Sequence, residues 1–73
     1  MQVRHYMTAA AAVTHPDEPV VAAARLMRQR SIGALPVCED DGTLAGVLTD
    51  RDIVVRCVSA GDDPQTATVR GIM

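Results

Sequence analysis

Apolar residues in the first half of the chain recur with the spacing of one helix face. They fall at positions i, i+3, i+4 and i+7, as Val20, Ala23, Ala24 and Met27. Pro19 suits the first turn of such a helix, because a backbone N–H at that position would have no partner within the helix. The pattern predicts a helix that begins near Pro19 and ends between Ser31 and Gly33, with Gly33 as the candidate for the residue just past its end.

Two short apolar runs after this helix predict a β-hairpin. Residues 34–38 and 44–48 are each typical of a strand, and the acidic segment between them contains Asp41-Gly42, a pair typical of tight hairpin turns. Pro36 cannot donate a hydrogen bond to a sheet. We therefore expect the first of these strands to lie at an edge or to be irregular at Pro36.

A second helix is predicted directly after the hairpin. It begins near Thr49 or Asp50 and ends at Gly61. Its apolar face consists of Ile53, Val54, Cys57 and Val58. Ahead of the first helix, residues 8–16 are typical of extended chain, with a short strand at residues 13–14. The order strand, helix, strand, strand, helix indicates an α+β fold.

The two ends of the chain carry the same short pattern. Residues 3–7 and residues 69–73 both read Val-Arg-x-(Tyr/Ile)-Met, at an offset of 66 residues. We expect a short helical turn over the first copy. Because the second copy falls on the last five residues, we predict one repeat over residues 1–67 and the beginning of a second repeat, or a C-terminal tail, over residues 68–73.

The composition limits the kind of protein and its partners. The chain has 73 residues, of which 48% are apolar but only one is aromatic, so its core is thin and built from small aliphatic side chains. We therefore expect it to need a partner, most simply a second copy in a homodimer. The net charge is −2 and the seven arginines are scattered, which argues against a nucleic-acid partner.

Membrane, metal and catalytic signals are weak. The longest apolar runs have five residues, whereas a membrane helix needs about 20, so we expect no membrane partner and a cytoplasmic location. Cys38 and Cys57 lack the spacing of a metal site or a disulfide scaffold, and His5 and His15 lack a third ligand at a suitable spacing. No known nucleophile or phosphate-loop motif is present, so we expect no enzyme activity, no metal and no cofactor.

The sharpest local motif is Gly-Val-Leu-Thr-Asp-Arg-Asp at residues 46–52, where the second hairpin strand runs into the second helix. Thr49 at the helix start and Asp52 three residues later can form a capping box, in which each side chain bonds the other residue's backbone N–H. The same groups can instead bind a ligand: Asp52 the hydroxyls of a ribose, and Thr49 and Arg51 a phosphate. The spacing alone leaves both interpretations open.

Together these segments resemble a CBS domain, the repeat named after cystathionine β-synthase. The resemblance rests on residues 3–8, 22–27, 31–37 and 46–53 and so extends over nearly the whole chain. It implies a β-α-β-β-α fold with a small three-stranded sheet and two helices on one side. It also implies that two repeats pack sheet to sheet, with clefts between them that bind AMP, ADP, ATP, S-adenosylmethionine or NAD.

The resemblance assigns roles to individual positions of this chain. Asp52 is expected to hold the ribose hydroxyls, Thr49 to contact ribose or phosphate, and Arg51 to contact phosphate. Thr14, with its neighbours Val13 and His15, is expected to contact the base. The adenine slot is expected to be lined by Ile32, Gly33, Ala34, Leu35 and Pro36.

These observations predict a non-catalytic regulatory module that binds an adenosine-containing ligand between paired repeats and signals by shifting their arrangement. Two alternatives stay open. In the first, the chain is a ligand-free structural or dimerisation module, in which Thr49 and Asp52 only cap a helix. In the second, it is a fragment of a longer CBS-containing enzyme.

Overall fold

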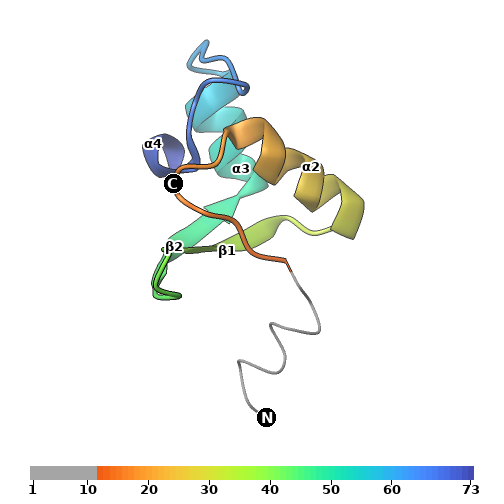
Figure 1. Cartoon of the computed structure of the whole chain (residues 1–73). Helices are drawn as coiled ribbons and strands as arrows, with labels where there is room; N and C mark the ends of the chain where they lie inside the picture. The colour runs from red at the N-terminus through yellow and green to blue at the C-terminus, as the bar shows by residue number, and fades with distance from the viewer. Residues whose placement is uncertain (1–11) are drawn as a thin grey trace.

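The computed structural model describes residues 12–73 (Figure 1). The helical turn predicted over residues 3–7 lies outside the described residues, as does the first part of the extended stretch predicted over residues 8–16. The described elements are α2 (Val20–Arg30), β1 (Ala34–Cys38), β2 (Leu44–Thr49), α3 (Asp50–Ile53), the π-helix η1 (Val54–Val58) and α4 (Val69–Ile72). The predicted α+β class is confirmed.

β1 and β2 form an antiparallel hairpin in which Leu35 lies opposite Leu48. The expected third strand is reduced, within the described residues, to a single parallel bridge between Thr14 and Val37. The chain turns away directly afterwards, because Pro16 has no N–H with which to continue a ladder. The sheet is therefore a two-stranded hairpin with one bridging residue along the free edge of β1.

The core lies between the inner face of the hairpin and the helices, which lie on the same side of the sheet in Figure 1. Its buried apolar residues are Val20, Ala23, Met27, Leu35, Val37, Leu48, Cys57, Val69 and Ile72. The predicted inner face of α2 is confirmed at its first, second and last positions, while Ala24 is half-buried. Every core side chain is aliphatic or sulfur-containing, as the composition predicted, so each one buries only a small apolar area.

The end of α2 differs from the prediction. The left-handed residue that terminates the helix is Ser31, with φ 55°, and its N–H donates to the carbonyls of Met27 and Arg28. Gly33 is therefore not the residue that ends the helix. Gly33 lies against the side chain of Asp50: a Cβ built on Gly33 would fall 2.9 Å from Asp50 Oδ2.

The second helix opens as α3 and continues as the π-helix η1. Its backbone hydrogen bonds there span five residues, as in the bond from Ser59 N to Val54 O at 2.8 Å. The wider turn separates the apolar positions predicted to share one face. Cys57 is fully buried, but Val54 and Val58 are 58% and 60% exposed, so their assignment to the core face is wrong.

α4 packs into the same core as the elements before it. Val69 is fully buried and Ile72 is 3% exposed, and Thr68 pairs with Pro19 in an antiparallel bridge. Residues 69–73 therefore contribute to the packing of this unit. Whether they also begin a second repeat stays a prediction.

The turn between β1 and β2 is closed by Asp41 and Thr43. The Thr43 hydroxyl and the Thr43 N–H both donate to Asp41 Oδ1, at 2.6 and 3.0 Å, and Gly42 has φ 86°. The predicted Asp-Gly hairpin turn is confirmed. The hydroxyl bond, and after it the backbone bond, lower the pKa of the Asp41 carboxyl below its usual range.

This turn generates a pH prediction. A lowered pKa in the folded state stabilises the protein above the unfolded pKa of an aspartate, and that contribution is lost as pH falls through the folded value. Thr43→Val removes the hydroxyl, so we expect it to melt below wild type at neutral pH and to approach wild type below about pH 4. Thr43→Ser keeps the hydroxyl and is the control. If the difference in melting temperature between Thr43→Val and wild type is the same at neutral and acidic pH, this account is wrong.

Burial predicts a large effect of Val→Ala at one site and almost none at another. Val69→Ala removes methyl groups from a fully buried position, and we expect it to lower the unfolding free energy by about 2 kcal/mol, or the melting temperature by about 10 °C. Val58→Ala makes the same change where the side chain is 60% exposed, and we expect a change within about 0.5 kcal/mol. Calorimetry on the two variants checks both, and equal losses would refute the assignment of α4 to the core.

Candidate functional site

The segments predicted to form the ligand site meet along β1. On one edge of this strand, Thr14 N donates to Pro36 O at 2.9 Å, and Cys38 N donates to Thr14 O at the same distance. On the other edge, Ala34 lies opposite Thr49. Segments more than 30 residues apart in the chain thus become neighbours across a single strand.

The pleat of β1 divides the predicted adenine slot between two faces. Leu35 is fully buried as a whole residue, so it belongs to the core and offers no surface to a ligand. Ala34 and Pro36 point to the opposite, outer face, where Ala34 is exposed and Pro36 half-buried. Ile32, just before the strand, is 37% exposed. The outer face therefore presents a small apolar surface beside Thr49.

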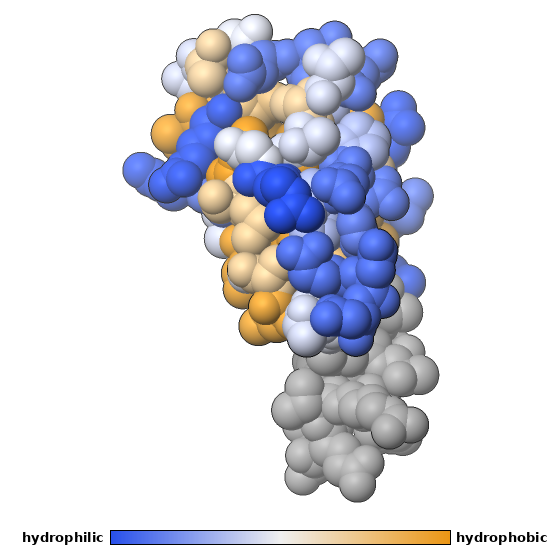
Figure 2. All heavy atoms as spheres, turned by 60° about the vertical axis from the view of Figure 1, so that its left-hand side comes forward, coloured by the Kyte–Doolittle hydropathy of each residue, from blue (hydrophilic) through white to orange (hydrophobic). Residues whose placement is uncertain are grey.

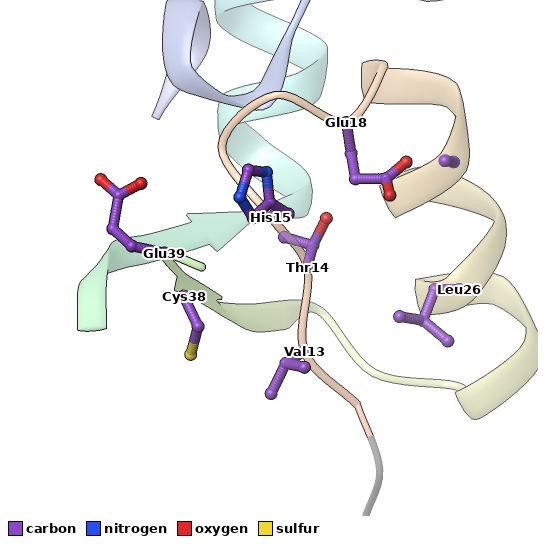
Figure 3. A pocket seen from close by; sticks show the side chains of 8 residues that line it. Val13, Thr14, His15, Glu18, Leu26, Cys38 and Glu39 are labelled. Carbon is purple, nitrogen blue, oxygen red and sulfur yellow. The ribbon is translucent and has the colours of Figure 1, made fainter. Parts of the chain in front are cut away.

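Thr14 faces the other way. It pairs with buried Val37 and is only 8% exposed, and Figure 3 shows its side chain directed to the side of α2. The structure therefore does not place the Thr14 side chain beside Thr49 and Asp52.

A groove of about 430 Å³ lies beside Thr14, between α2 and the end of β1 (Figure 3). It is lined by Val13, Thr14, His15, Glu18, Ala22, Leu26, Cys38 and Glu39. Thr14 and its neighbours Val13 and His15, the residues predicted to contact the base, are among them. The acidic members of the groove, Glu18 and Glu39, were not predicted, because nothing in their spacing along the chain indicates that they line one groove.

Thr49 and Asp52 form the capping box at the start of α3. Asp52 N donates to Thr49 Oγ1 at 3.1 Å, and Thr49 N donates to Asp52 Oδ2 at 2.9 Å. The other carboxylate oxygen of Asp52, Oδ1, lies 3.9 Å from Arg56 Nε in a long ion pair. The capping interpretation is confirmed, and Oδ1 is the oxygen with capacity to accept a bond from a ligand hydroxyl.

Gly33 and Asp50 bring the end of α2 against the start of α3. Asp50 N donates to Gly33 O at 2.9 Å, and Asp50 Oδ1 accepts from Arg51 N at 2.8 Å. A Cβ at position 33 would meet the Asp50 carboxylate, which is the end of an exposed side chain, so the contact limits the rotamers of Asp50 and does not by itself require glycine. Arg51 is exposed at the same place.

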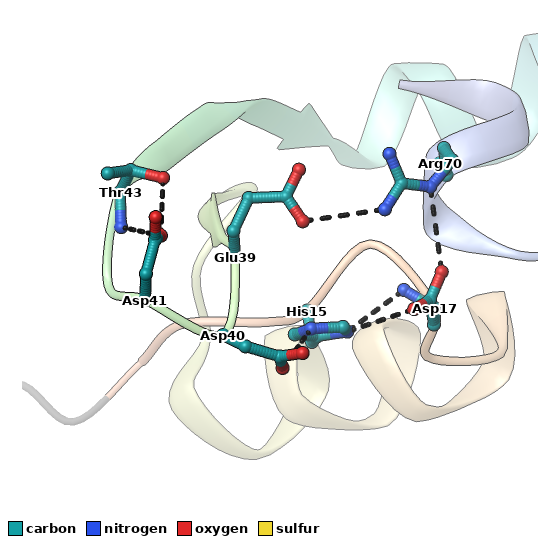
Figure 4. Close-up of polar contacts among 7 residues, drawn as sticks. All are labelled: His15, Asp17, Glu39, Asp40, Asp41, Thr43 and Arg70. Carbon is teal, nitrogen blue, oxygen red and sulfur yellow. Dashed lines mark hydrogen bonds and ion pairs between the residues drawn. The ribbon is translucent and has the colours of Figure 1, made fainter.

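A charged cluster lies at the opposite end of β1, around His15 (Figure 4). His15 Nδ1 accepts from Asp17 N at 3.1 Å, and His15 Nε2 lies 2.7 Å from Asp40 Oδ1, although this ring nitrogen is not oriented for a hydrogen bond to that oxygen. Arg70 Nε lies 3.5 Å from Asp17 Oδ1, and Arg70 Nη2 lies 3.4 Å from Glu39 Oε1. The cluster ties the segment before α2, the hairpin turn and α4 together.

Within residues 12–73, no group of three or more His, Cys, Asp and Glu side chains is arranged to hold a metal ion. Over the same residues, no helix is long and apolar enough to cross a membrane.

The chain matches one protein family and several curated relatives. A family profile described as the CBS domain matches residues 3–59. Hypoxic response protein 1 of Mycobacterium tuberculosis is 51% identical over 65 residues, which are 89% of this chain and 46% of that protein. The CBS domain-containing protein YhcV of Bacillus subtilis is 45% identical over 64 residues, 88% of this chain and 45% of that protein. This chain therefore spans about half the length of these relatives.

A solved structure agrees with the fold. The crystal structure of Hypoxic Response Protein I with two coordinated zinc ions superposes with a TM-score of 0.79 and 50% identity, over 82% of this chain and 50% of that one. The zinc ions belong to that protein.

The capping box generates a prediction for the free protein. Thr49→Ala removes the acceptor of the Asp52 N–H, and we expect it to lower the unfolding free energy by about 1 kcal/mol. Thr49→Ser keeps an acceptor at the same position and is expected to retain most of the stability. Urea unfolding of both variants without any ligand checks this, and equal midpoints for Thr49→Ala and wild type would show that the box contributes nothing.

Proposed function

Because this chain belongs to the CBS domain family, whose members are generally regulatory modules, we propose that it binds an adenosine-containing ligand between paired CBS repeats. AMP, ADP, ATP, S-adenosylmethionine and NAD are the candidate ligands. In this proposal the chain carries out no chemistry. Its output is the relative arrangement of two repeats, which the ligand shifts by binding one arrangement more tightly than the other.

The observation that carries the proposal is the placement of Asp52 beside the outer face of β1. Thr49 lies opposite Ala34 across the hairpin, and Asp52 is held against Thr49 by the capping box. Its Oδ2 is occupied by the Thr49 N–H, whereas Oδ1 faces only the long ion pair with Arg56. A ribose hydroxyl can therefore bond Oδ1 without breaking the cap, and the two interpretations of the motif are compatible.

The surface next to Asp52 suits the rest of such a ligand. Ala34, Pro36 and Ile32 offer an apolar surface on which a planar base can pack. Gly33 has no side chain, so the base can also approach the backbone there. Arg51 is exposed at the helix start, where a phosphate would lie. This arrangement supplies one wall of a cleft. A second repeat, or a second copy of the chain, has to supply the other.

Uncovered apolar side chains support pairing of repeats. The exposed large apolar residues are Val13, Ile32, Leu44, Val47, Val54, Val55 and Val58. Figure 2 shows apolar side chains gathered at the lower left of one face and hydrophilic side chains along its right side. A protein of this size with a thin core gains stability by covering such a surface. We propose a homodimer or a second repeat as the partner.

A ligand-free dimerisation module is the second candidate. The specific observation in its favour is that both groups of the motif are already hydrogen-bonded within the chain, so a structural role accounts for their presence. In that case Thr49 and Asp52 affect stability and no ligand changes it.

A thermal-shift panel separates the two candidates. We expect at least one adenosine ligand to raise the melting temperature, whereas GTP leaves it unchanged. At 100 times its dissociation constant a ligand stabilises by about 2.7 kcal/mol, or about 10 °C or more for so small a domain. The shift should disappear in Thr49→Ala/Asp52→Ala.

The matched control is Asp41→Ala/Thr43→Ala, which removes another hydrogen-bonded Thr/Asp pair at the far end of the hairpin. This variant should keep the ligand-induced shift even if its own melting temperature falls. A panel with no shift in wild type would favour the dimerisation module, and sedimentation equilibrium would then test for the dimer itself.

A further inference from the structure

The groove beside Thr14 contains two polar side chains that no described residue bonds. Thr14 is only 8% exposed, and within residues 12–73 its hydroxyl makes no hydrogen bond. The Glu18 carboxylate makes neither a hydrogen bond nor an ion pair with any of these residues. Because a buried hydroxyl without a partner lowers stability, a group that bonds it from within the groove would recover that loss.

The wall of the groove next to these two groups is apolar. Ala22 and Leu26 both line it, since residues four apart in a helix share a face. Figure 3 shows the Thr14 hydroxyl and the Glu18 side chain on the side of α2, with Leu26 below them. The volume of about 430 Å³ lies in the range of small-molecule sites. The groove can therefore hold a ligand with one polar end and an apolar body.

The charges around the groove favour a cation. Glu18 and Glu39 both line it, and the lining contains no lysine or arginine. His15, the lining residue that can become positive, has its Nε2 2.7 Å from Asp40 Oδ1. The start of α2 offers no free donors to an anion, because the N–H groups of residues 20–22 all bond backbone carbonyls. An anionic ligand would thus meet carboxylates, whereas a cationic ligand meets complementary charge.

We propose that this groove binds a small organic cation, namely a primary ammonium group on an apolar body. The ammonium donates to the Glu18 carboxylate and to Thr14 Oγ1, and the apolar body lies along Leu26. An ammonium has three donors and no acceptor, so it satisfies both oxygens at once. Glu18 has this role because the Glu39 carboxylate is shared with Arg70, 3.4 Å away.

This site is separate from the one proposed for an adenosine ligand. The Thr14 side chain is directed to α2, whereas Thr49 lies across the other edge of β1, opposite Ala34. A ligand in the groove therefore does not contact Asp52, and each of the two proposals can be tested without the other.

An NMR titration of the full chain with three matched probes tests the sign of the charge. 2-Phenylethylamine, 2-phenylethanol and phenylacetate share a phenyl ring and differ in the charge of the head group. We expect the amine to shift the amide signals of residues 13–15, 20–26 and 38–39 in a saturable way, but not those of residues 49–52. The alcohol should bind about tenfold more weakly or worse, and phenylacetate should not bind. Equal affinity for amine and alcohol, or amine shifts confined to other residues, would overturn the proposal.

The role of Glu18 is tested by removing its charge. Glu18→Gln keeps the size of the side chain, and we expect it to raise the dissociation constant of 2-phenylethylamine about tenfold or more. Asp62→Asn removes an exposed carboxylate that does not line the groove, and it should leave the constant unchanged. If both variants weaken the amine equally, its binding depends on the net charge of the protein and not on this site.

Thr14→Val tests the hydroxyl by two measurements, because it replaces the hydroxyl with a methyl group of similar shape. We expect the free variant to melt at or above the wild-type temperature, since no hydrogen bond is lost. We expect 2-phenylethylamine to bind it about fivefold more weakly, whereas Thr14→Ser should retain the binding. A Thr14→Val variant that melts well below wild type, or that binds the amine as tightly, would contradict the assignment of the hydroxyl to a ligand.

Discussion

Leu35 and Leu48 face one another across the hairpin, and both side chains are fully buried against the helices. Because successive residues of a strand point to opposite faces, this one pair sets the orientation of its neighbours. Ala34 and Thr49, which also face one another, are turned to the outer side. A shift of one residue in the register would bury Thr49 and expose the leucines, and the candidate site would be lost together with the core.

The same constraint explains why the site and the stability of the domain are coupled. Thr49 ends β2 and caps α3, so its hydroxyl lies where the outer face of the sheet meets a helix start. Asp52 is positioned by its bond to the Thr49 N–H, and its second oxygen is directed to the weak ion pair with Arg56. Under the proposed function, this residue pair, which orders the backbone in the free protein, would already be ordered for the ligand, so binding would not have to order it.

The thin aliphatic core also accounts for what the chain leaves uncovered. It is completed by α4, whose Val69 and Ile72 reach into it from the C-terminal end, while Val54 and Val58 of η1 remain exposed. The relatives are about twice as long as this chain. The exposed apolar surface is what the proposed pairing with another copy or repeat would cover.

The sequence by itself determined the elements whose patterns are local. The helical spacing from Val20 to Met27, the Asp41-Gly42 turn and the Thr49–Asp52 capping box each depend on residues a few positions apart, and each was confirmed. The tertiary structure decided what depends on packing between distant segments. The π-helical turn exposed Val54 and Val58, Ser31 rather than Gly33 ended α2, and the bridge to Val37 turned Thr14 away from Asp52. Spacing along a chain fixes which residues can share a face, but the direction of that face is set by the segments packed against it.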